Sequence, residues 1–259
     1  MNSENLSNSY SSSPITNQHK VQFISFAWQH LLLFCSLFIM TLGVALTIRS
    51  SLGSSVISSI PMAFTMAGET GKAPNLSVGE YTNLMNIILV GIQILILRKK
   101  FEKVQLFQLL IGTLFGWLLD FNMWLTSTLL LDSITLQALA QLAGCIILGI
   151  GIAFEIKCGS ITMPGEGVPA AISRKYGTPF PKAKIGVDIS LVTIAVILGY
   201  IFFSKWIISV IGPGTLFAMI FVGIVVKYVD KHIGWFDHVL AYRPGFRRYI
   251  YGLARHIKH

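Results

Sequence analysis

The sequence predicts an all-α, polytopic membrane protein with about six transmembrane helices in two inverted three-span repeats, each with a re-entrant or broken helical segment. Composition is the first reason, because 53% of the 259 residues are hydrophobic, 12% are charged and the mean hydropathy is +0.67. A soluble domain of this size exposes far more polar surface. The apolar residues also form runs of about 20 or more, long enough to cross a bilayer as helices. The third reason is an internal repeat.

Six apolar runs predict the spans. Before them, residues 1–20 are rich in serine and asparagine and predict a disordered tail. After them, residues 231–259 form a second, basic tail. In chain order the predicted spans are Val21–Ile48, Glu80–Leu97, Val104–Leu131, Leu136–Ile156, Ile185–Phe203 and Trp206–Val229.

Lysines and arginines concentrate in alternate connections, which predicts the orientation. They are dense between the second and third spans, between the fourth and fifth, and in the C-terminal tail, and sparse elsewhere. Because such residues favour the cytoplasmic side, both termini are predicted to be cytoplasmic. The net charge of +9 is therefore a topology signal, and no nucleic-acid partner is expected.

The segment Ser54–Ala67 is apolar enough to enter the membrane, yet it is short and contains Pro61. As a seventh span it would place the basic cluster 98–103 outside, against the charge rule. We therefore expect a half-helix or re-entrant segment, buried in protein or lining a wet cavity. Glu166–Arg174 is expected to be its counterpart.

The repeat is clearest when Gly43–Pro61 is aligned with Gly151–Pro169. This alignment matches Ala45 with Ala153, Ile48 with Ile156, Arg49 with Lys157 and Pro61 with Pro169. Weaker matches follow, including Gly79 with Gly186, Gly112 with Gly223 and Asp120 with Asp230.

The two repeats would span residues 21–131 and 132–230. Three crossings is an odd number, so the second repeat would enter the membrane upside down relative to the first. Many secondary transporters have this arrangement, with the binding site at the paired interrupted segments. Chance similarity between glycine- and isoleucine-rich helices is the alternative.

Three blocks, GVALTIRSSLGSS, SVGEYTNLMNIILVGIQILILRKKF and GPGTLFAMIFVGIVVKYVD, resemble the YczE/YyaS/YitT family of bacterial integral membrane proteins. The resemblance covers roughly residues 25–232. It implies a bacterial inner-membrane protein of five or six helices with no settled activity and no catalytic residues to carry over. In that family proline often follows the first glycine turn closely, whereas here Ser54 and Ser55 follow Gly53.

Asp120 is the strongest candidate for a functional charge within a span. Ionisable residues inside membrane helices are costly and usually mark a pathway. A desolvated carboxylate there could exchange a proton or bind a cation. An interfacial cap beside Trp117 and Trp124 is an equal alternative.

Glu155, Glu166 and Asp188 are the other candidate carboxylates for a solute or ion pathway. Glu166 lies in a glycine-rich turn and suits a cation, whereas the N–H groups of the half-helix after it suit an anion. The alternatives are an ion pair with Lys157 or extension to the membrane surface for Glu155, a solvated loop for Glu166 and helix capping for Asp188.

Arg49 and Lys157 occupy matching positions in the two repeats. They could clamp an anion from opposite sides, or simply extend to the membrane surface. Glycines and prolines are expected to form the turns of the broken segments, namely Gly53, Pro61, Gly159, Pro164, Gly165, Gly167 and Pro169.

No motif indicates an enzyme or a cofactor. The three cysteines, Cys35, Cys145 and Cys158, lack metal-site or disulfide spacing, and the histidines form no close ligand pair. The Gly-rich stretch at 68–72 lacks Walker spacing. We therefore expect no metal, no cofactor and no catalytic residues.

The tail from Phe246 places Tyr249, Ile250, Leu253 and Ile257 on one helical face among basic residues. This pattern predicts an amphipathic helix on anionic lipid, with binding of a partner protein as the alternative.

The sequence as a whole favours a secondary transporter or facilitator of an unidentified small solute. The rival is a membrane accessory protein that supports a partner through its helices and tail without transporting anything. Substrate, coupling ion and oligomeric state stay open.

Overall fold

The computed structural model of the chain describes residues 14–240, 249–251 and 253, and these contain helices and no strand. The long helices are α1 (Pro14–Arg49), α3 (Val78–Leu97), α4 (Phe107–Leu125), α5 (Ile134–Cys158), α7 (Phe180–Phe203) and α8 (Pro213–His232). The short helices are α2 (Val56–Glu69), η1 (Arg98–Lys100), η2 (Lys103–Leu106), α6 (Pro164–Tyr176) and α9 (Gly234–Leu240).

Six helices are long and apolar enough to cross a membrane, so the chain is a multi-pass membrane protein, as expected. The candidate spans are Phe23–Arg49, Val78–Lys100, Lys103–Leu125, Ile134–Cys158, Phe180–Phe203 and Pro213–His232. Each of them overlaps one span predicted from the sequence.

Three of the predicted boundaries differ from those of the helices by six or seven residues. The last span begins at Pro213 and not at Trp206, because Gly212 and Pro213 form a helix start and proline is disfavoured further inside a helix. The third span ends at Leu125 and not at Leu131, because turn bonds from Ser127 to Trp124 and from Leu129 to Thr126 replace the helical pattern. The first helix begins at Pro14, so residues 14–20, assigned to the tail, are helical.

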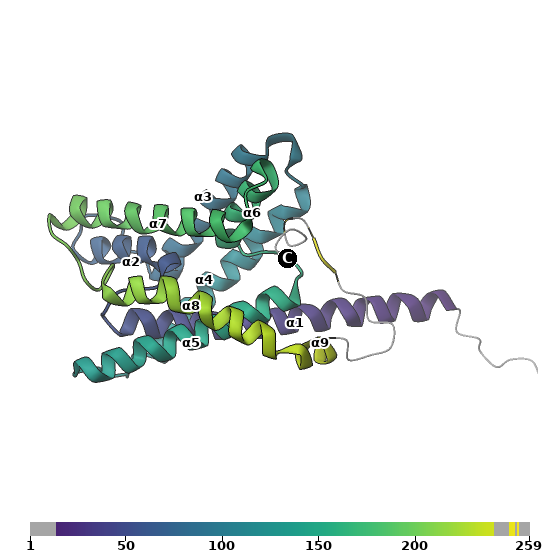
Figure 1. The fold of residues 1–259 in the computed structure, drawn as a ribbon, viewed down its shortest axis with the longest axis horizontal. Helices are drawn as coiled ribbons and strands as arrows, with labels where there is room; N and C mark the ends of the chain where they lie inside the picture. The colour runs from purple at the N-terminus through teal and green to yellow at the C-terminus, as the bar shows by residue number, and fades with distance from the viewer. Residues whose placement is uncertain (1–13, 241–248, 252, 254–259) are drawn as a thin grey trace, which may run out of the picture.

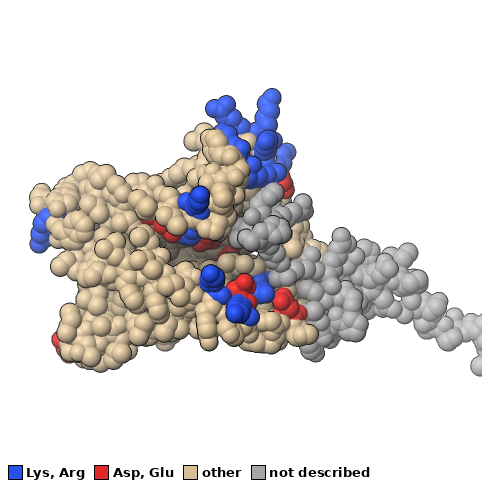
Figure 2. Space-filling model, in the orientation of Figure 1, with Lys and Arg blue, Asp and Glu red and all other residues tan. Residues whose placement is uncertain are grey.

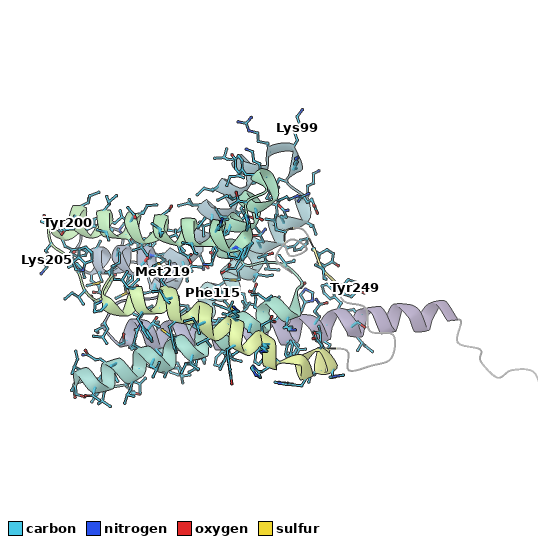
Figure 3. All side chains as sticks on the ribbon, in the orientation of Figure 1. Lys99, Phe115, Tyr200, Lys205, Met219 and Tyr249 are labelled. Atoms are coloured by element: carbon cyan, nitrogen blue, oxygen red, sulfur yellow. The ribbon has the colours of Figure 1, made fainter. Side chains whose placement is uncertain are left out.

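Helices α1 and α5 pack along each other and run antiparallel, on the lower side of the view in Figure 1. Their backbones approach closely because glycines lie at the contacts: Gly144 lies against Thr47 and Gly151 against Met40. α4 packs on α1 and α8 packs on α5. The largest apolar cluster fills this bundle, with Leu37, Phe115 and Leu119 fully buried (Figure 3).

A second group of helices consists of α2, α3, α6 and α7. α2 packs against α3 and α7, and α6 packs against the same two helices. The two groups are joined mainly where α3 packs along α4, whereas α7 and α8 have little contact. The two groups of helices are therefore in contact on the side of α3 and α4 and are apart on the side of α7 and α8.

The two short helices α2 and α6 occupy the segments where half-helices were expected. They contain 14 and 13 residues, about 20 Å of helix each, against a hydrocarbon core of about 30 Å. Pro61 lies inside α2 and Pro169 inside α6. Neither helix could cross a bilayer.

Charged side chains lie mainly at the ends of the molecule. Most of the lysines and arginines in view gather at the end that carries the α3–α4 connection (Figure 2), and Lys99 and Lys205 lie at opposite ends (Figure 3). The long helices expose apolar side chains such as Ile197 and Ile220 to the surrounding lipid.

The expected amphipathic helix of the tail lies mostly outside the described residues. Tyr249–Tyr251 are not helical, and the Gln29 side chain accepts from the Tyr249 N–H at 3.0 Å and donates to its C=O at 2.8 Å. Leu253 is buried against Leu97 and Ala170. Part of the tail therefore packs on the protein itself.

Candidate functional site

The first turns of α2 and α6 meet inside the molecule. A side-chain carbon at Gly165, in the first turn of α6, would collide with Ile57 of α2, and Ile57 also packs in one cluster with Val168. Ser55 precedes α2 and its hydroxyl lies 2.7 Å from that of Ser58. The two interrupted segments thus converge at their N-terminal ends.

Glutamines on α3 and α4 hold the start of α6. Gln93 Nε2 donates to the Pro164 carbonyl at 3.3 Å, and Gln108 Nε2 donates to Gln93 Oε1 at 3.1 Å. A Cβ at Gly167 would lie 2.5 Å from Gln93 Nε2 and 2.6 Å from Gln108 Oε1. A side chain at position 167 would therefore have to displace this pair of amides.

Glu155, near the end of α5, directs its side chain to the N-terminal end of α6. Its side chain is buried, with the residue 4% exposed, and Oε1 accepts the Met163 N–H at 3.3 Å. Oε2 has no hydrogen-bond partner among the described residues. A carboxyl group of the protein therefore already occupies the N-terminal end of α6, which carries the positive end of the helix dipole.

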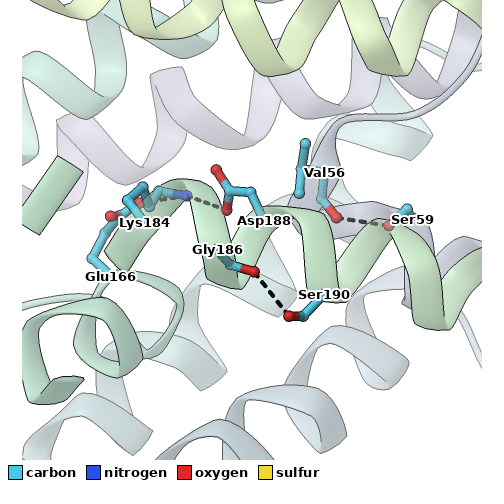
Figure 4. Close-up of polar contacts among 7 residues, drawn as sticks. All are labelled: Val56, Ser59, Glu166, Lys184, Gly186, Asp188 and Ser190. Atoms are coloured by element: carbon cyan, nitrogen blue, oxygen red, sulfur yellow. Dashed lines mark hydrogen bonds and ion pairs between the residues drawn. The ribbon is translucent and has the colours of Figure 1, made fainter. Parts of the chain in front are cut away.

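Glu166 forms an ion-pair cluster with two residues of α7. Lys184 Nζ lies 3.6 Å from Glu166 Oε1 and 2.6 Å from Asp188 Oδ1. Figure 4 shows the ammonium between the two carboxylates. The side chains of Glu166 and Asp188 are 16% and 15% exposed and that of Lys184 is 32% exposed, so the lysine is the most accessible member of the cluster.

Burial raises the pKa of Glu166, Asp188 raises it further, and Lys184 opposes both effects. Glu166 also lies within electrostatic range of Glu155. Glu166 and Asp188 therefore share a single ammonium group, that of Lys184.

Asp120 joins α4 to the start of α3. Its Oδ2 accepts from the Ser77 hydroxyl at 2.6 Å, and its Oδ1 accepts from the Gly79 N–H at 2.8 Å. Glu80 completes a capping box with Ser77. The Asp120 carboxylate therefore caps the start of α3 from a neighbouring helix.

Arg49 and Asp120 line one shallow pocket of about 570 Å³, together with Glu80 and Trp124. Arg49 Nη2 donates to the Met123 carbonyl at 2.6 Å. The pocket lies at the end of the molecule where α1 and α4 finish. It is separate from the cluster around Glu166.

Lys157 pairs with Asp230 at 3.6 Å and with Asp237 at 3.4 Å. Because Gly151 lies against Met40 and Gly144 against Thr47, Lys157 is level with Phe34 on the antiparallel helix. That position is about 15 residues from Arg49, or about 22 Å along the axis. Arg49 and Lys157 are too far apart to clamp one small anion.

The structure thus brings together Glu155, Glu166 and Asp188 and separates them from Asp120, Arg49 and Lys157. Sequence reasoning missed Lys184, Gln93 and Gln108. The signals for them were present: Lys184 precedes Asp188 by one helical turn, and both glutamines interrupt apolar runs. Within the described part of the chain, no three His, Cys, Asp or Glu side chains could hold a metal ion.

Of the expected turn residues, Gly53 and Gly159 have positive φ angles of 121° and 59°. The loop at Gly53 packs against the start of α8, where the Gly214 N–H donates to the Leu52 carbonyl at 2.9 Å. Pro164 and Gly165 begin α6, while Pro61 and Pro169 lie inside their helices.

Comparison with known proteins gives one match. A protein-family model described as "Family of unknown function (DUF6198)" matches residues 27–231. No curated protein and no solved structure matches. The resemblance to the YczE/YyaS/YitT family is not confirmed by this match.

Proposed function

Since the chain belongs to this family of unknown function, we propose from its geometry that it is a secondary transporter of a small solute, working by alternating access. The single observation that carries the proposal is a difference between two matching helix pairs: α3 and α4 are closed together, and α7 and α8 are not. The proposal places the protein in a bacterial cytoplasmic membrane with both termini in the cytoplasm.

The contacts between α1 and α5 support an inverted repeat. Gly43 contacts Leu148, and Gly151 contacts Met40. The offset of 108 that matches Gly43 with Gly151 also matches Met40 with Leu148, so the two contacts exchange when the repeats are exchanged. A two-fold axis in the membrane plane would produce this pattern.

Other helix contacts follow the same exchange. The packing of α2 on α7 corresponds to that of α6 on α3, and α2 on α3 corresponds to α6 on α7. Likewise α1 on α4 corresponds to α5 on α8. The pair α3 and α4 should correspond to α7 and α8, and there the correspondence fails.

The surroundings of matching glycines also differ between the α3–α4 pair and the α7–α8 pair. At Gly79 a Cβ would lie 2.5 Å from the Asp120 carboxyl carbon, and at Gly112 it would lie 2.9 Å from Asn86 Nδ2. Their sequence counterparts Gly186 and Gly223 have nothing within 4 Å of a Cβ. The α7–α8 pair therefore has the small residues of a close helix contact without the contact.

In the proposed cycle the two pairs alternate. One state has α3 and α4 together and α7 and α8 apart, and the other has the reverse. Figure 2 shows acidic and basic side chains at depth in a hollow between the α7 and α8 sides of the molecule. The cluster of Glu166, Lys184 and Asp188 would be reached through that hollow.

Spin-label distances test the cycle. One labelled pair, Gly186→Cys with Gly223→Cys, reports on α7 and α8. The matched pair, Gly91→Cys with Leu110→Cys, reports on α3 and α4. Both pairs are made in a background without native cysteines and measured in lipid nanodiscs. Gly91 has open space around it and Leu110 is 68% exposed, so both tolerate a label. We expect two distance populations for each pair, with conditions that shorten one lengthening the other. One fixed distance for each pair under all conditions would contradict the proposal.

A further inference from the structure

The ion-pair cluster beside α6 indicates the class of solute. Glu166 and Asp188 share a single cation, Lys184. The neighbouring charges are already neutralised, because Lys157 pairs with Asp230 and Asp237, and Arg174 pairs with Glu102 at 3.1 Å. Lys182 is exposed. In α2 and α3 the charged residues lie near helix ends, at Glu69 and Glu80.

Unpartnered acceptors point to the same class. Glu155 Oε2 is buried without a partner among the described residues, and so is Gln108 Oε1, which borders Gly167. A carboxylate oxygen buried without a hydrogen bond or counter-ion is costly. N–H donors are the groups that would satisfy acceptor oxygens of this kind.

The N-terminal end of α6 would by itself favour an anionic solute. The position of Glu155 bears on this possibility. An anion would bind at the N-terminal end of α6, but the Glu155 carboxylate already accepts the Met163 N–H there. An anion that entered the cluster would meet the carboxyl groups of Glu166 and Asp188 at close range. Repulsion from these carboxylates disfavours an anionic solute.

We propose that the solute is a small organic ammonium ion, which binds between Glu166 and Asp188 in place of the Lys184 ammonium. This inference rests on the proposed transport function and adds the ligand class. Lysine carries a compact charge on a flexible stem, so its ammonium can leave the carboxylates and point into the hollow. Lys184 is then a built-in competitor that keeps the site neutralised when the solute is absent.

Ligand binding to the purified protein in nanodiscs tests the inference without requiring transport. The probe is ethylammonium chloride, compared with sodium chloride and sodium acetate, and the readout is saturable thermal stabilisation. We expect stabilisation by ethylammonium alone. Glu166→Gln and Asp188→Asn should abolish it, and Lys184→Gln should tighten the apparent affinity about tenfold by removing the competitor. Lys182→Gln, in the same turn, is the matched control and should bind as the wild type does.

A second measurement needs no substitution and covers the case in which a variant fails to fold. Acylation of Lys184 relative to Lys182 is measured by mass spectrometry. The ratio should rise when ethylammonium is added, because the displaced Lys184 becomes accessible. An unchanged ratio, stabilisation by acetate, or equal ethylammonium binding in wild type, Glu166→Gln and Asp188→Asn would overturn the inference.

The two proposals fail separately. If the spin-label distances exchange but ethylammonium does not bind, the ligand class is wrong and transport stands. If ethylammonium binds as expected but both distances stay fixed, the site is right and alternating access is wrong.

Discussion

Asp120 on α4 accepts a 2.8 Å hydrogen bond from the backbone N–H of Gly79, at the start of α3. The same carboxylate accepts the Ser77 hydroxyl. Two helices are thus fastened by one side chain at a position where a helix start has unsatisfied N–H groups. This contact gives Asp120 a structural role independent of any role in a pathway.

Asp120→Ala is expected to lower the free energy of unfolding by roughly 1–3 kcal/mol, because the Gly79 N–H and the Ser77 hydroxyl lose their acceptor. Asp120→Asn keeps one carbonyl oxygen and should cost less. Thermal unfolding in detergent, followed by circular dichroism, measures both. Wild-type stability of the alanine variant would contradict the structural role.

Glycines at matching positions should respond differently to the same substitution. Gly79→Ala forces a methyl group into the Asp120 carboxyl and the Gly116 carbonyl, and overpacking of this kind costs roughly 1–3 kcal/mol. Gly186→Ala adds its methyl group to open space and should be within about 0.5 kcal/mol of wild type. The comparison of unfolding midpoints is decisive because the two residues are sequence counterparts. Equal losses would mean that α7 and α8 are as close as α3 and α4.

Much of the fold could be predicted from the sequence. A helix that crosses a bilayer needs a certain length and an apolar composition, and each apolar run in the sequence shows both directly. The six spans and the two short segments at Pro61 and Pro169 are of this kind. Boundaries were harder. The start of α8 at Pro213 was missed because residues 206–212 are apolar, and hydropathy does not report that they form turns.

The candidate site was only partly predictable, because its partners are distant in sequence. Glu166 and Asp188 could be nominated from their types and positions, but their shared Lys184 depends on how α6 packs against α7. The role of Glu155 at the start of α6 likewise depends on the fold of the loop between Cys158 and Met163. Asp120 and Arg49 were placed in the same hypothetical pathway, although they line a separate pocket.

Stability should depend on the titration of Glu166. Its folded-state pKa is raised above the usual 4.5, chiefly by burial. The folded state therefore binds this proton more tightly than the unfolded state, so the stabilisation is fully present below pH 4.5 and is lost as the pH rises through the folded-state pKa. Relative to Glu166→Gln, the wild type should gain stability as the pH is lowered from neutral towards 4.5. Parallel curves of unfolding midpoint against pH would show that burial does not shift this carboxyl.

The orientation of the protein can be checked at the two ends marked by Lys99 and Lys205, which lie far apart in Figure 3. In a background without the three native cysteines, Lys205→Cys should react with a membrane-impermeant maleimide in intact bacterial spheroplasts, and Lys99→Cys should not. The reason is the charge asymmetry, since Lys99 belongs to the basic connection that favours the cytoplasm. Lysis of the spheroplasts is the control and should make Lys99→Cys reactive. The reverse labelling pattern would invert the membrane topology, and the hollow between α7 and α8 would then be reached from the opposite face.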